Sequence, residues 1–458
     1  MTHTLFVLDP VETLCSAAFG QLVRPSISYE AVYWKDGQRG KKRTSYIKDV
    51  FIHKDGRSCR FHTGLLPRIN KFCKDREITF RLKYTQRVII PGTDPQLPGI
   101  TFRPDQLSAI QKARKHQRGI IHHATATGKT VILAGIASCF RDCRMLILVH
   151  SLDLLKQLVE DFRGFGFKNI QTIGGGKNFG YLVGDIVIAT CKSFVKLEPD
   201  LYSTYFDLVM VDEAHHVSDT DGTYGRILNN LFAPLRFGFT ATIPEQDDKK
   251  LAMEGLLGPI ISKYAINEAA GDDVVSRPRI KIVKISTSYG IRSSREWPKV
   301  YQKGVVENKN LTDKVVSETK LALDKGDSVL VFCVKVEHGK ILAEALEDVI
   351  KQPVAFIHGA TDPDERLSYK KKIMSKEIRC IVCNVVWREG INIPSLNTIV
   401  NAGGGKSLTL VTQMLGRGLR RTGSKTDFFL VDFFDPSHHY LIEHFGQRIS
   451  FYSENGWL

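Results

Sequence analysis

The stretch His123–Thr130, HATATGKT, is the most informative part of this sequence, because it stands between an apolar segment that begins at Gly119 and a second one at Val131–Ala137. That order predicts a strand, a loop and a buried helix. Gly128-Lys129-Thr130 at the mouth of a helix gathers backbone N–H groups, an ammonium group and a hydroxyl around one point, which suits a nucleoside triphosphate with Mg²⁺. His123 stands where the G-x-x-x-x-G-K-[ST] pattern has its first glycine, so a chance Gly-Lys-Thr in a turn stays an alternative at this point.

Composition bounds the class of protein. The 458 residues suffice for two or three domains, at about 100 to 200 residues per domain. No apolar run approaches the roughly 20 residues that span a bilayer, and the N-terminus has no charged region before its short apolar run. We therefore expect a cytoplasmic protein with no membrane segment.

The nine cysteines carry little functional signal. Their close pairs, Cys139/Cys143 and Cys380/Cys383, lie in apolar segments and lack further spaced Cys or His ligands. We expect reduced thiols in the core rather than a zinc site.

Positive charge is concentrated near the N-terminus. The net charge is +15, and residues 1–90 hold 17 Lys and Arg against 8 Asp and Glu, which accounts for +9. This excess favours a polyanionic partner but does not identify it.

Residues 1–95 are expected to form a small β-rich domain. Ile27–Trp34 and Ser45–Ile52 are rich in aromatic and β-branched residues and predict a hairpin, with a turn at Asp36-Gly37. Its loop would carry the basic cluster RGKKR, which includes Lys41, Lys42 and Arg43. Basic residues among aromatic ones suit phosphate contact and base stacking, and a solvated hairpin remains the alternative.

The rest of the chain alternates buried strands with helices. Pro91–Gly99, with three prolines and two glycines, predicts a linker, and Pro104 opens a helix. Apolar runs over 100–272 predict a parallel sheet covered on both faces, with strands at 145–149, 185–190, 206–212 and 236–240. The alternation repeats over 278–458, with strands at 328–333, 354–357, 378–383 and 398–400. We expect an α/β protein with two doubly wound parallel-sheet domains in tandem after the β-rich domain.

Two carboxylates support the nucleotide hypothesis. Asp212-Glu213 directly follows the apolar run 206–211, so both side chains stand at the carboxyl end of a predicted strand. Asp212 suits the Mg²⁺ shell and Glu213 suits activation of the attacking water. Acidic side chains at this point without a cation are the weaker alternative once Lys129 is considered.

The series of motifs resembles that of superfamily 2 helicases and translocases of the DEAH type. The motifs span about 100–435 and stand in the order Gln106, Gly128-Lys129-Thr130, Asp212-Glu213-Ala214-His215, Thr240-Ala241-Thr242 and Gln413–Arg420 (QMLGRGLR). The layout, with a small basic N-terminal domain, is most similar to phage branch-migration helicases of the UvsW type. The resemblance implies RecA-like domains, ATP and Mg²⁺ as cofactors, and single-stranded, forked or branched DNA as the partner, with 3′ to 5′ polarity.

The same resemblance assigns roles around ATP. It implies nucleotide contacts from Gln106, Thr127, Gly128, Lys129 and Thr130, with Gln106 on the adenine and Lys129 on the β- and γ-phosphates. Thr130 and Asp212 would hold Mg²⁺. From the second domain, the γ-phosphate would be reached by Gln413, Arg417 and Arg420, whose guanidinium groups suit the charge of a transferring phosphoryl group.

Further positions match family motifs for nucleic acid and coupling. Nucleic-acid contacts are implied for Ser151, Gly174, Gly175, Thr190 and Lys335. Coupling of ATP state to nucleic acid is implied for His215, Thr240, Thr242 and Gly390. A flexible turn at 174–176 and a strand-end hydroxyl at Thr190 are the alternatives without a function.

The sequence departs from the family pattern at His123, Ala126, Asn384 and Asn392. Ala126 replaces a common glycine and would pay a steric cost at positive φ. Lys129, Thr130, Asp212 and Glu213 are retained, so hydrolysis is still expected.

Three other functions remain open at the level of sequence. The chain could be an RNA helicase or a duplex translocase that does not separate strands. It could also be an ATP-gated DNA-binding subunit of a larger nuclease.

Overall fold

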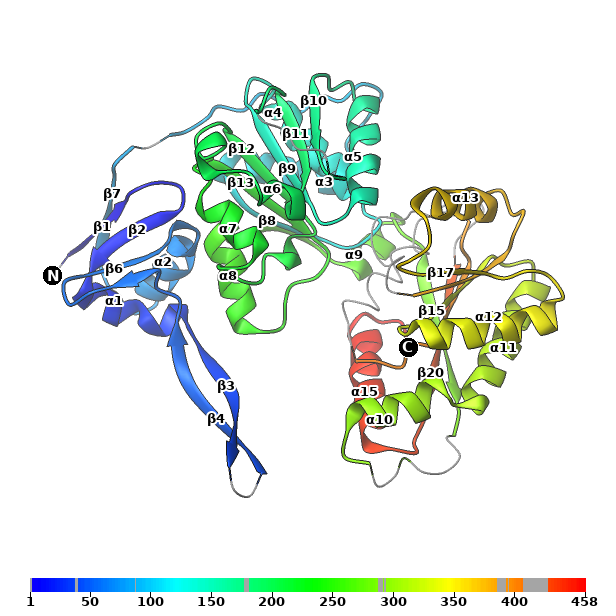
Figure 1. Cartoon of the computed structure of the whole chain (residues 1–458). Helices are drawn as coiled ribbons and strands as arrows, with labels where there is room; N and C mark the ends of the chain where they lie inside the picture. The colour runs from blue at the N-terminus through cyan, green and yellow to red at the C-terminus, as the bar shows by residue number, and fades with distance from the viewer. Residues whose placement is uncertain are drawn as a thin grey trace. The chain divides into compact units, whose positions relative to one another are not determined.

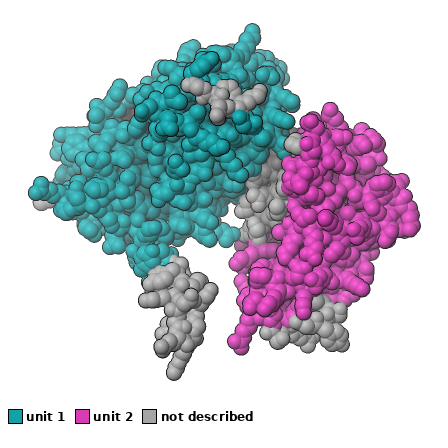
Figure 2. All heavy atoms as spheres, in the orientation of Figure 1, with its two compact units in different colours: residues 1–123, 128–264 teal, residues 124–127, 265–458 magenta. Residues whose placement is uncertain are grey.

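The structure is a computed structural model that describes residues 2–37, 40–86, 88–176, 181–286, 291, 294–384, 393, 395–406 and 427–458. Contacts between Cα atoms divide it into two units, 1–123 with 128–264 and 124–127 with 265–458 (Figure 2). Each unit is described by itself. Among the described residues, no helix combines the length and the apolar character needed to cross a bilayer.

The N-terminal part of unit 1 is a small mixed sheet with helices on it. Its strand order is β5-β6-β2-β1-β7, and β1 pairs in parallel with β7 while the other neighbours are antiparallel. The elements are β1 His3–Val7, β2 Glu12–Ser16, α1 Ala17–Val23, β5 His53–Lys54, β6 Ser58–His62, α2 Leu66–Lys74 and β7 Phe80–Tyr84. The β-rich prediction for this region is therefore confirmed.

The predicted hairpin is longer than the sequence pattern suggests. β3 Ser28–Gly37 and β4 Gly40–Asp49 form a two-stranded antiparallel ribbon that extends away from the N-terminal sheet in Figure 1. Pairing between the described residues continues to Gly37 and Gly40. As a result Lys41, Lys42 and Arg43 lie in β4 and not in a loop, because the ladder extends past the point where the aromatic and β-branched pattern stops.

The second part of unit 1 contains a seven-stranded sheet in the order β10-β11-β9-β12-β13-β8-β14, with all described pairs parallel. Its strands are β8 Arg118–His123, β9 Met145–Val149, β10 Ile170–Ile173, β11 Ile186–Thr190, β12 Leu208–Asp212, β13 Leu235–Thr240 and β14 Ile260–Tyr264. The helices are α3 Pro104–His116, α4 Lys129–Cys139, α5 Leu152–Gly164, α6 Cys191–Phe194, α7 Thr223–Asn229 and α8 Asp247–Leu257.

Alternate side chains of these strands enter two different cores. In β9, Leu146 and Leu148 join the cluster that holds residues of α6, α7 and α8, whereas Ile147 and Val149 join the cluster that holds residues of α3, α4 and α5. A strand buried on both faces explains the continuous apolar runs in the sequence. The doubly wound prediction is confirmed for this domain.

Unit 2 contains a six-stranded sheet in the order β15-β20-β19-β16-β18-β17, again with all described pairs parallel. Its strands are β15 Arg277–Lys284, β16 Val329–Phe332, β17 Ala355–Ile357, β18 Cys380–Cys383, β19 Thr398–Asn401 and β20 Asp427–Phe434. Its helices are α9 Ile266–Gly271, α10 Trp297–Tyr301, α11 Lys309–Asp324, α12 Val336–Ile350, α13 Pro363–Met374 and α15 His439–Glu454.

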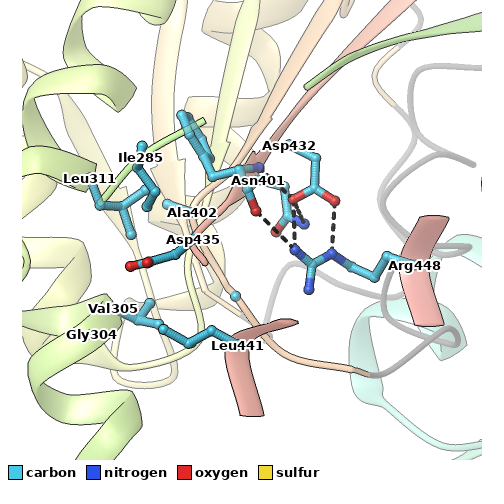
Figure 3. A pocket seen from close by; sticks show the side chains of 12 residues that line it. Ile285, Gly304, Val305, Leu311, Asn401, Ala402, Asp432, Asp435, Leu441 and Arg448 are labelled. Carbon is cyan, nitrogen blue, oxygen red and sulfur yellow. Dashed lines mark hydrogen bonds and ion pairs between the residues drawn. The ribbon is translucent and has the colours of Figure 1, made fainter. Parts of the chain in front are cut away.

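A buried ion pair fixes α15 to this sheet. Arg448 of α15 binds Asp432 of β20 through two contacts, Nε to Oδ2 at 2.7 Å and Nη2 to Oδ1 at 3.1 Å, and Tyr452 donates to Asp432 Oδ2 at 2.8 Å. Figure 3 shows this pair beside Asn401, in the wall of a pocket. Arg448 also donates to the carbonyl of Gly405 at 2.6 Å, so one guanidinium holds the helix, the strand and the loop after β19 together.

The N-terminal part is fixed firmly to α8. Gly64 lies so close to this helix that an added Cβ would overlap the carbonyl oxygens of Glu254 and Gly255. Around this contact, Arg68 binds Glu254 at 2.7 Å, and His62 Nε2 lies 3.0 Å from Asn229 Oδ1.

The connecting segment after β7 is also bound along its length. Gln117 bonds to both the N–H and the carbonyl of Ile90, Thr93 N–H donates to Cys139, and Gln96 N–H donates to Ser138. Thus the linker has irregular structure, as its prolines predict, but it lies bound on the α/β domain.

All nine cysteines are outside disulfides and buried, which confirms the expectation of core thiols. Burial raises the pKa of Cys15, Cys191 and Cys380 to about 12.

Candidate nucleotide site

The loop between β8 and α4 has the backbone that a phosphate loop requires. Gly128 precedes α4 with φ 83°, and Ala126 has φ 65°. Both values lie in the left-handed region, which glycine adopts without steric strain and which costs alanine about 1–2 kcal/mol. A Cβ at Gly128 would lie 2.7 Å from Gln106 Nε2, so a side chain at this position would displace the Gln106 amide. Ala126 therefore carries the strain that its replacement of glycine predicts.

Lys129 and Thr130 form the first turn of α4. Lys129 Nζ donates to the carbonyl of His123 at 3.3 Å, so the ammonium group bends back over the loop. Thr127 is fully buried, and its hydroxyl donates to the carbonyl of Ala124 at 2.8 Å, which closes the loop from within. The N-terminus of α4 adds backbone N–H groups and the positive end of the helix dipole.

Gln106 lies against this loop from α3. Its Oε1 accepts the N–H of Arg103 at 3.1 Å, which caps the helix and fixes the amide. Arg103 is held in turn by Asp105, with Nε to Oδ1 at 3.0 Å and Nη2 to Oδ2 at 3.1 Å, and its Nη1 would lie 3.7 Å from a Cβ at Gly128. Arg103 is thus a guanidinium at the site that motif reasoning missed, although its place three residues before Gln106 could have drawn attention to it.

The two carboxylates stand at the end of β12, where the sequence predicts them. Asp212 is the last residue of the strand, and Glu213 has φ 49°, with its N–H donating to Asp212 Oδ1 at 3.0 Å. Burial, and then the like charge of Glu213, raise the pKa of Asp212 to about 6, and Lys129 opposes this.

This electrostatic arrangement fits a divalent cation, since an added positive charge would relieve the repulsion between the carboxylates. Among the described residues, no group of three or more His, Cys, Asp or Glu side chains could hold a metal ion alone. Mg²⁺ binds proteins through one or two carboxylates plus substrate phosphates, so Asp212 with the Thr130 hydroxyl matches its usual donor set.

The Thr240–Thr242 turn follows β13 and contacts the carboxylate loop. Thr240 Oγ1 donates to the Thr242 carbonyl at 2.8 Å and accepts the Thr242 N–H at 3.2 Å. His215 Nδ1 lies 3.2 Å from Thr240 Oγ1 and 3.4 Å from Glu213 Oε2. The structure therefore brings the expected coupling residues His215, Thr240 and Thr242 together beside Glu213.

The expected nucleic-acid positions of unit 1 gather at the carboxyl ends of β9, β10 and β11. Ser151 caps α5 through its Oγ, which accepts the Leu154 N–H at 3.3 Å. A Cβ at Gly174 would lie 3.0 Å from Leu152 and 3.5 Å from Thr190, and Gly175 has φ 68°. These backbone positions form one cluster, with little space for a side chain at Gly174.

The remaining expected site residues that the structure describes belong neither to the nucleotide site nor to the cluster at the ends of β9, β10 and β11. In unit 2, Lys335 directly precedes α12 and its Nζ donates to Gln302 Oε1 at 2.7 Å. In β4, register places Lys41, Lys42 and Arg43 opposite Asp36, Lys35 and Trp34. Residues outside the described part of the chain are Gly390, Asn392, Gln413, Arg417 and Arg420.

Comparisons with known proteins agree with this arrangement. Residues 99–245 match the family model "Type III restriction enzyme, res subunit", and residues 311–422 match "Helicase conserved C-terminal domain". The chain is 27% identical to the DNA 3'-5' translocase XPB2 of Sulfurisphaera tokodaii over 70% of this chain and 79% of that protein. It is 26% identical to the ATP-dependent DNA helicase uvsW of Enterobacteria phage T4 over 72% of this chain and 68% of that protein. These matches support the assignment of the chain to the superfamily 2 helicases.

Solved structures support the fold of this helicase. A Saccharomyces cerevisiae structure, Dbp5 bound to RNA and ADP BeF3, matches with a TM-score of 0.54 and 16% identity, over 78% of this chain and 92% of that chain. At this identity the match shows the fold alone. It agrees with the tandem RecA-like domains expected from the motifs.

Proposed function

We propose that this superfamily 2 helicase is an ATP-driven motor on DNA that separates strands or moves branches at forked or branched substrates. The single observation that carries the proposal is the convergence of Lys129, Asp212 and Glu213 on one edge of the sheet, beside the Thr240–Thr242 turn. The names of the translocase and helicase relatives support DNA as the substrate. The name of the translocase relative supports 3′ to 5′ polarity. A place in DNA recombination or repair is part of the proposal, as the resemblance to branch-migration helicases implies.

In the proposed reaction, Lys129 and the amides at the start of α4 bind the β- and γ-phosphates of ATP, and Gln106 with Arg103 holds the base. Thr130 and Asp212 hold Mg²⁺, which neutralises phosphate charge when bound. Glu213 orients the attacking water and accepts its proton.

We propose that Gln413, Arg417 and Arg420, which lie outside the described residues, act on the γ-phosphate, as the family resemblance implies. An arginine at a transferring phosphoryl group is worth about 10³ to 10⁵ in rate.

DNA would lie along the cluster of Ser151, Gly174, Gly175 and Thr190, with Lys335 contacting it from the second domain. Backbone N–H groups and hydroxyls at these positions suit phosphate oxygens and carry no sequence preference. The β3–β4 ribbon with Lys41, Lys42 and Arg43 adds a basic arm for duplex or branched DNA.

An RNA helicase is the second candidate, because the structurally similar Dbp5 is described as bound to RNA. Strand displacement on a DNA fork, a Holliday junction and an RNA duplex distinguishes these substrates. A translocase that does not separate strands would hydrolyse ATP on DNA and release no strand. A switch subunit of a nuclease would show no multiple turnover with DNA.

The first test is Lys129→Ala. We expect DNA-stimulated ATP hydrolysis to fall below one hundredth of the wild-type rate, because the β- and γ-phosphates lose their ammonium partner. Steady-state turnover with and without DNA measures this, and circular dichroism confirms folding. Undiminished turnover in this variant would refute the assignment of the site.

A further inference from the structure

The Thr240–Thr242 turn has a second histidine contact that no family motif assigns. His122 is the penultimate residue of β8, and its Cα pairs with Thr240 of β13. Its ring Nε2 lies 3.2 Å from the carbonyl oxygen of Ala241, the middle residue of the turn. A carbonyl oxygen only accepts hydrogen bonds, so His122 donates. The turn is therefore held from two sides, by His122 at Ala241 and by His215 at Thr240.

The next residue, His123, points to the opposite face of the strand and is 1% exposed. Its Nε2 bonds to Ser262 Oγ of β14 at 2.9 Å, and its carbonyl accepts Lys129 Nζ. Two consecutive side chains thus fix the end of β8 to both neighbouring strands. The phosphate loop starts from this fixed point, so a shift of the loop is transmitted to the Ala241 carbonyl through one peptide unit.

These contacts form a continuous path through the site. The first contact is the hydrogen bond from Lys129 Nζ to the His123 carbonyl. The second is the hydrogen bond from His122, the preceding residue, to the Ala241 carbonyl. The last contacts join Thr240 to His215 and His215 to Glu213. The His122 contact is the step that joins the phosphate loop to the turn. Without it, the described side-chain contacts of the turn lead only to the carboxylate loop.

We propose that His122 is a positioning residue, whose hydrogen bond to Ala241 makes the turn follow the phosphate loop and so links nucleotide binding to stimulation by DNA. This inference rests on the proposed motor function. His122 touches neither ATP nor DNA in this scheme and acts through Ala241.

The inference requires an N–H donor at the position of His122 Nε2, and side-chain replacement tests this requirement. In His122→Gln, the side-chain amide N–H can reach about the same point, whereas His122→Leu fills similar space without a donor. We expect DNA-stimulated kcat to fall at least tenfold in the Leu variant and to stay within threefold of wild type in the Gln variant. The KM for ATP should stay within twofold in both, because Lys129 and Gln106 are unchanged.

The matched control is His116→Leu, at an exposed histidine at the end of α3, which should not change DNA-stimulated kcat. One hydrogen bond contributes only a small part of the stability of a domain, so the Leu variant should fold, and thermal melting checks this. If it does not fold, His122→Asn serves in its place, because its shorter amide cannot reach Ala241 and should lose the stimulation that Gln keeps.

Two results would overturn the inference. One is full DNA stimulation in the Leu variant, and the other is equal loss in the Leu and Gln variants, which would indicate a role for the ring itself. A wild-type protein without DNA-stimulated hydrolysis would instead refute the proposed function and the inference with it. This outcome can be distinguished from the first two, because hydrolysis by the wild-type protein is measured before any His122 variant is made.

Discussion

At the level of single residues, Ala126 allows a test of strain in the phosphate loop. Its φ of 65° costs an alanine about 1–2 kcal/mol. Glycine would remove this cost, but its more flexible unfolded chain would take back about 0.4–1 kcal/mol. We expect Ala126→Gly to stabilise the protein by about 0.5–1 kcal/mol, measured by chemical unfolding. Ala134→Gly, within α4, is the matched control and should destabilise. A loss of stability in both variants would show that Ala126 is not strained.

The positions of the motif side chains were predictable because their chemistry fixes their spacing. Lys129, Asp212 and Glu213 lie at a helix start and a strand end, as the sequence indicates. The contacts of Arg103 and His122 were not predictable, because they depend on which strands and loops become neighbours. β8 and β13 are adjacent in the sheet but more than a hundred residues apart in the chain. Periodicity within a segment contains no information about such a pairing.

At the level of elements, buried strands and their helices follow from the sequence more closely than edge strands do. The runs at 145–149 and 236–240 are strands in the structure as predicted. β15 Arg277–Lys284 was missed, because its basic residues and Pro278 resemble a domain boundary. Among the described strands it pairs only with β20, and an edge strand tolerates proline and charge. Its identity depends on β20, which is distant in sequence.

The contact between η2 Thr63–Leu65 and α8 also gives a prediction about pH. Burial lowers the pKa of the neighbouring His62 to about 4, from an ordinary value near 6.5. At a pH between these values the unfolded chain binds a proton at His62 that the folded chain does not. The contribution of His62 to the free energy of unfolding is therefore complete at neutral pH and is lost as pH falls from about 6.5 to about 4.

His62→Gln keeps an N–H for Asn229 and does not titrate. We expect the loss of unfolding free energy between pH 7 and pH 4.5 to be about 2–3 kcal/mol smaller in this variant than in wild type. Denaturant unfolding at the two pH values measures the difference. His53→Gln, at an exposed histidine of β5, is the control, and equal acid sensitivity of wild type and His62→Gln would contradict the prediction.

At the level of the whole molecule, the excess of positive charge in the first 90 residues was readable from composition, and the ribbon that carries its Lys41–Arg43 cluster was readable as a hairpin. What composition could not show is that this part of the chain forms one unit with the ATP-binding domain. That property comes from backbone contacts at Gly64 and from hydrogen bonds along the linker.

The ribbon makes a prediction about salt. Replacing Lys41, Lys42 and Arg43 by alanine removes three charges, so the slope of log affinity for forked DNA against log salt should become shallower by about two to three. Fluorescence anisotropy over a salt series measures the slope. A control with Lys370, Lys371 and Lys372 of α13 replaced loses the same charge away from the ribbon. An unchanged slope in the ribbon variant would exclude the ribbon from the DNA interface.

The glycine contact between the N-terminal part and α8 also limits how such proteins can exchange parts. Gly64 lies directly on the carbonyls of Glu254 and Gly255, and Gly255 in turn has His62 Cβ 3.1 Å from where its own Cβ would be. A side chain on either partner would force the two surfaces apart. Although the proline-rich linker looks like the natural point for a fusion, an N-terminal domain transplanted there would meet a helix that it does not match. The unit that can be inherited or exchanged intact therefore extends past the linker to the end of α8.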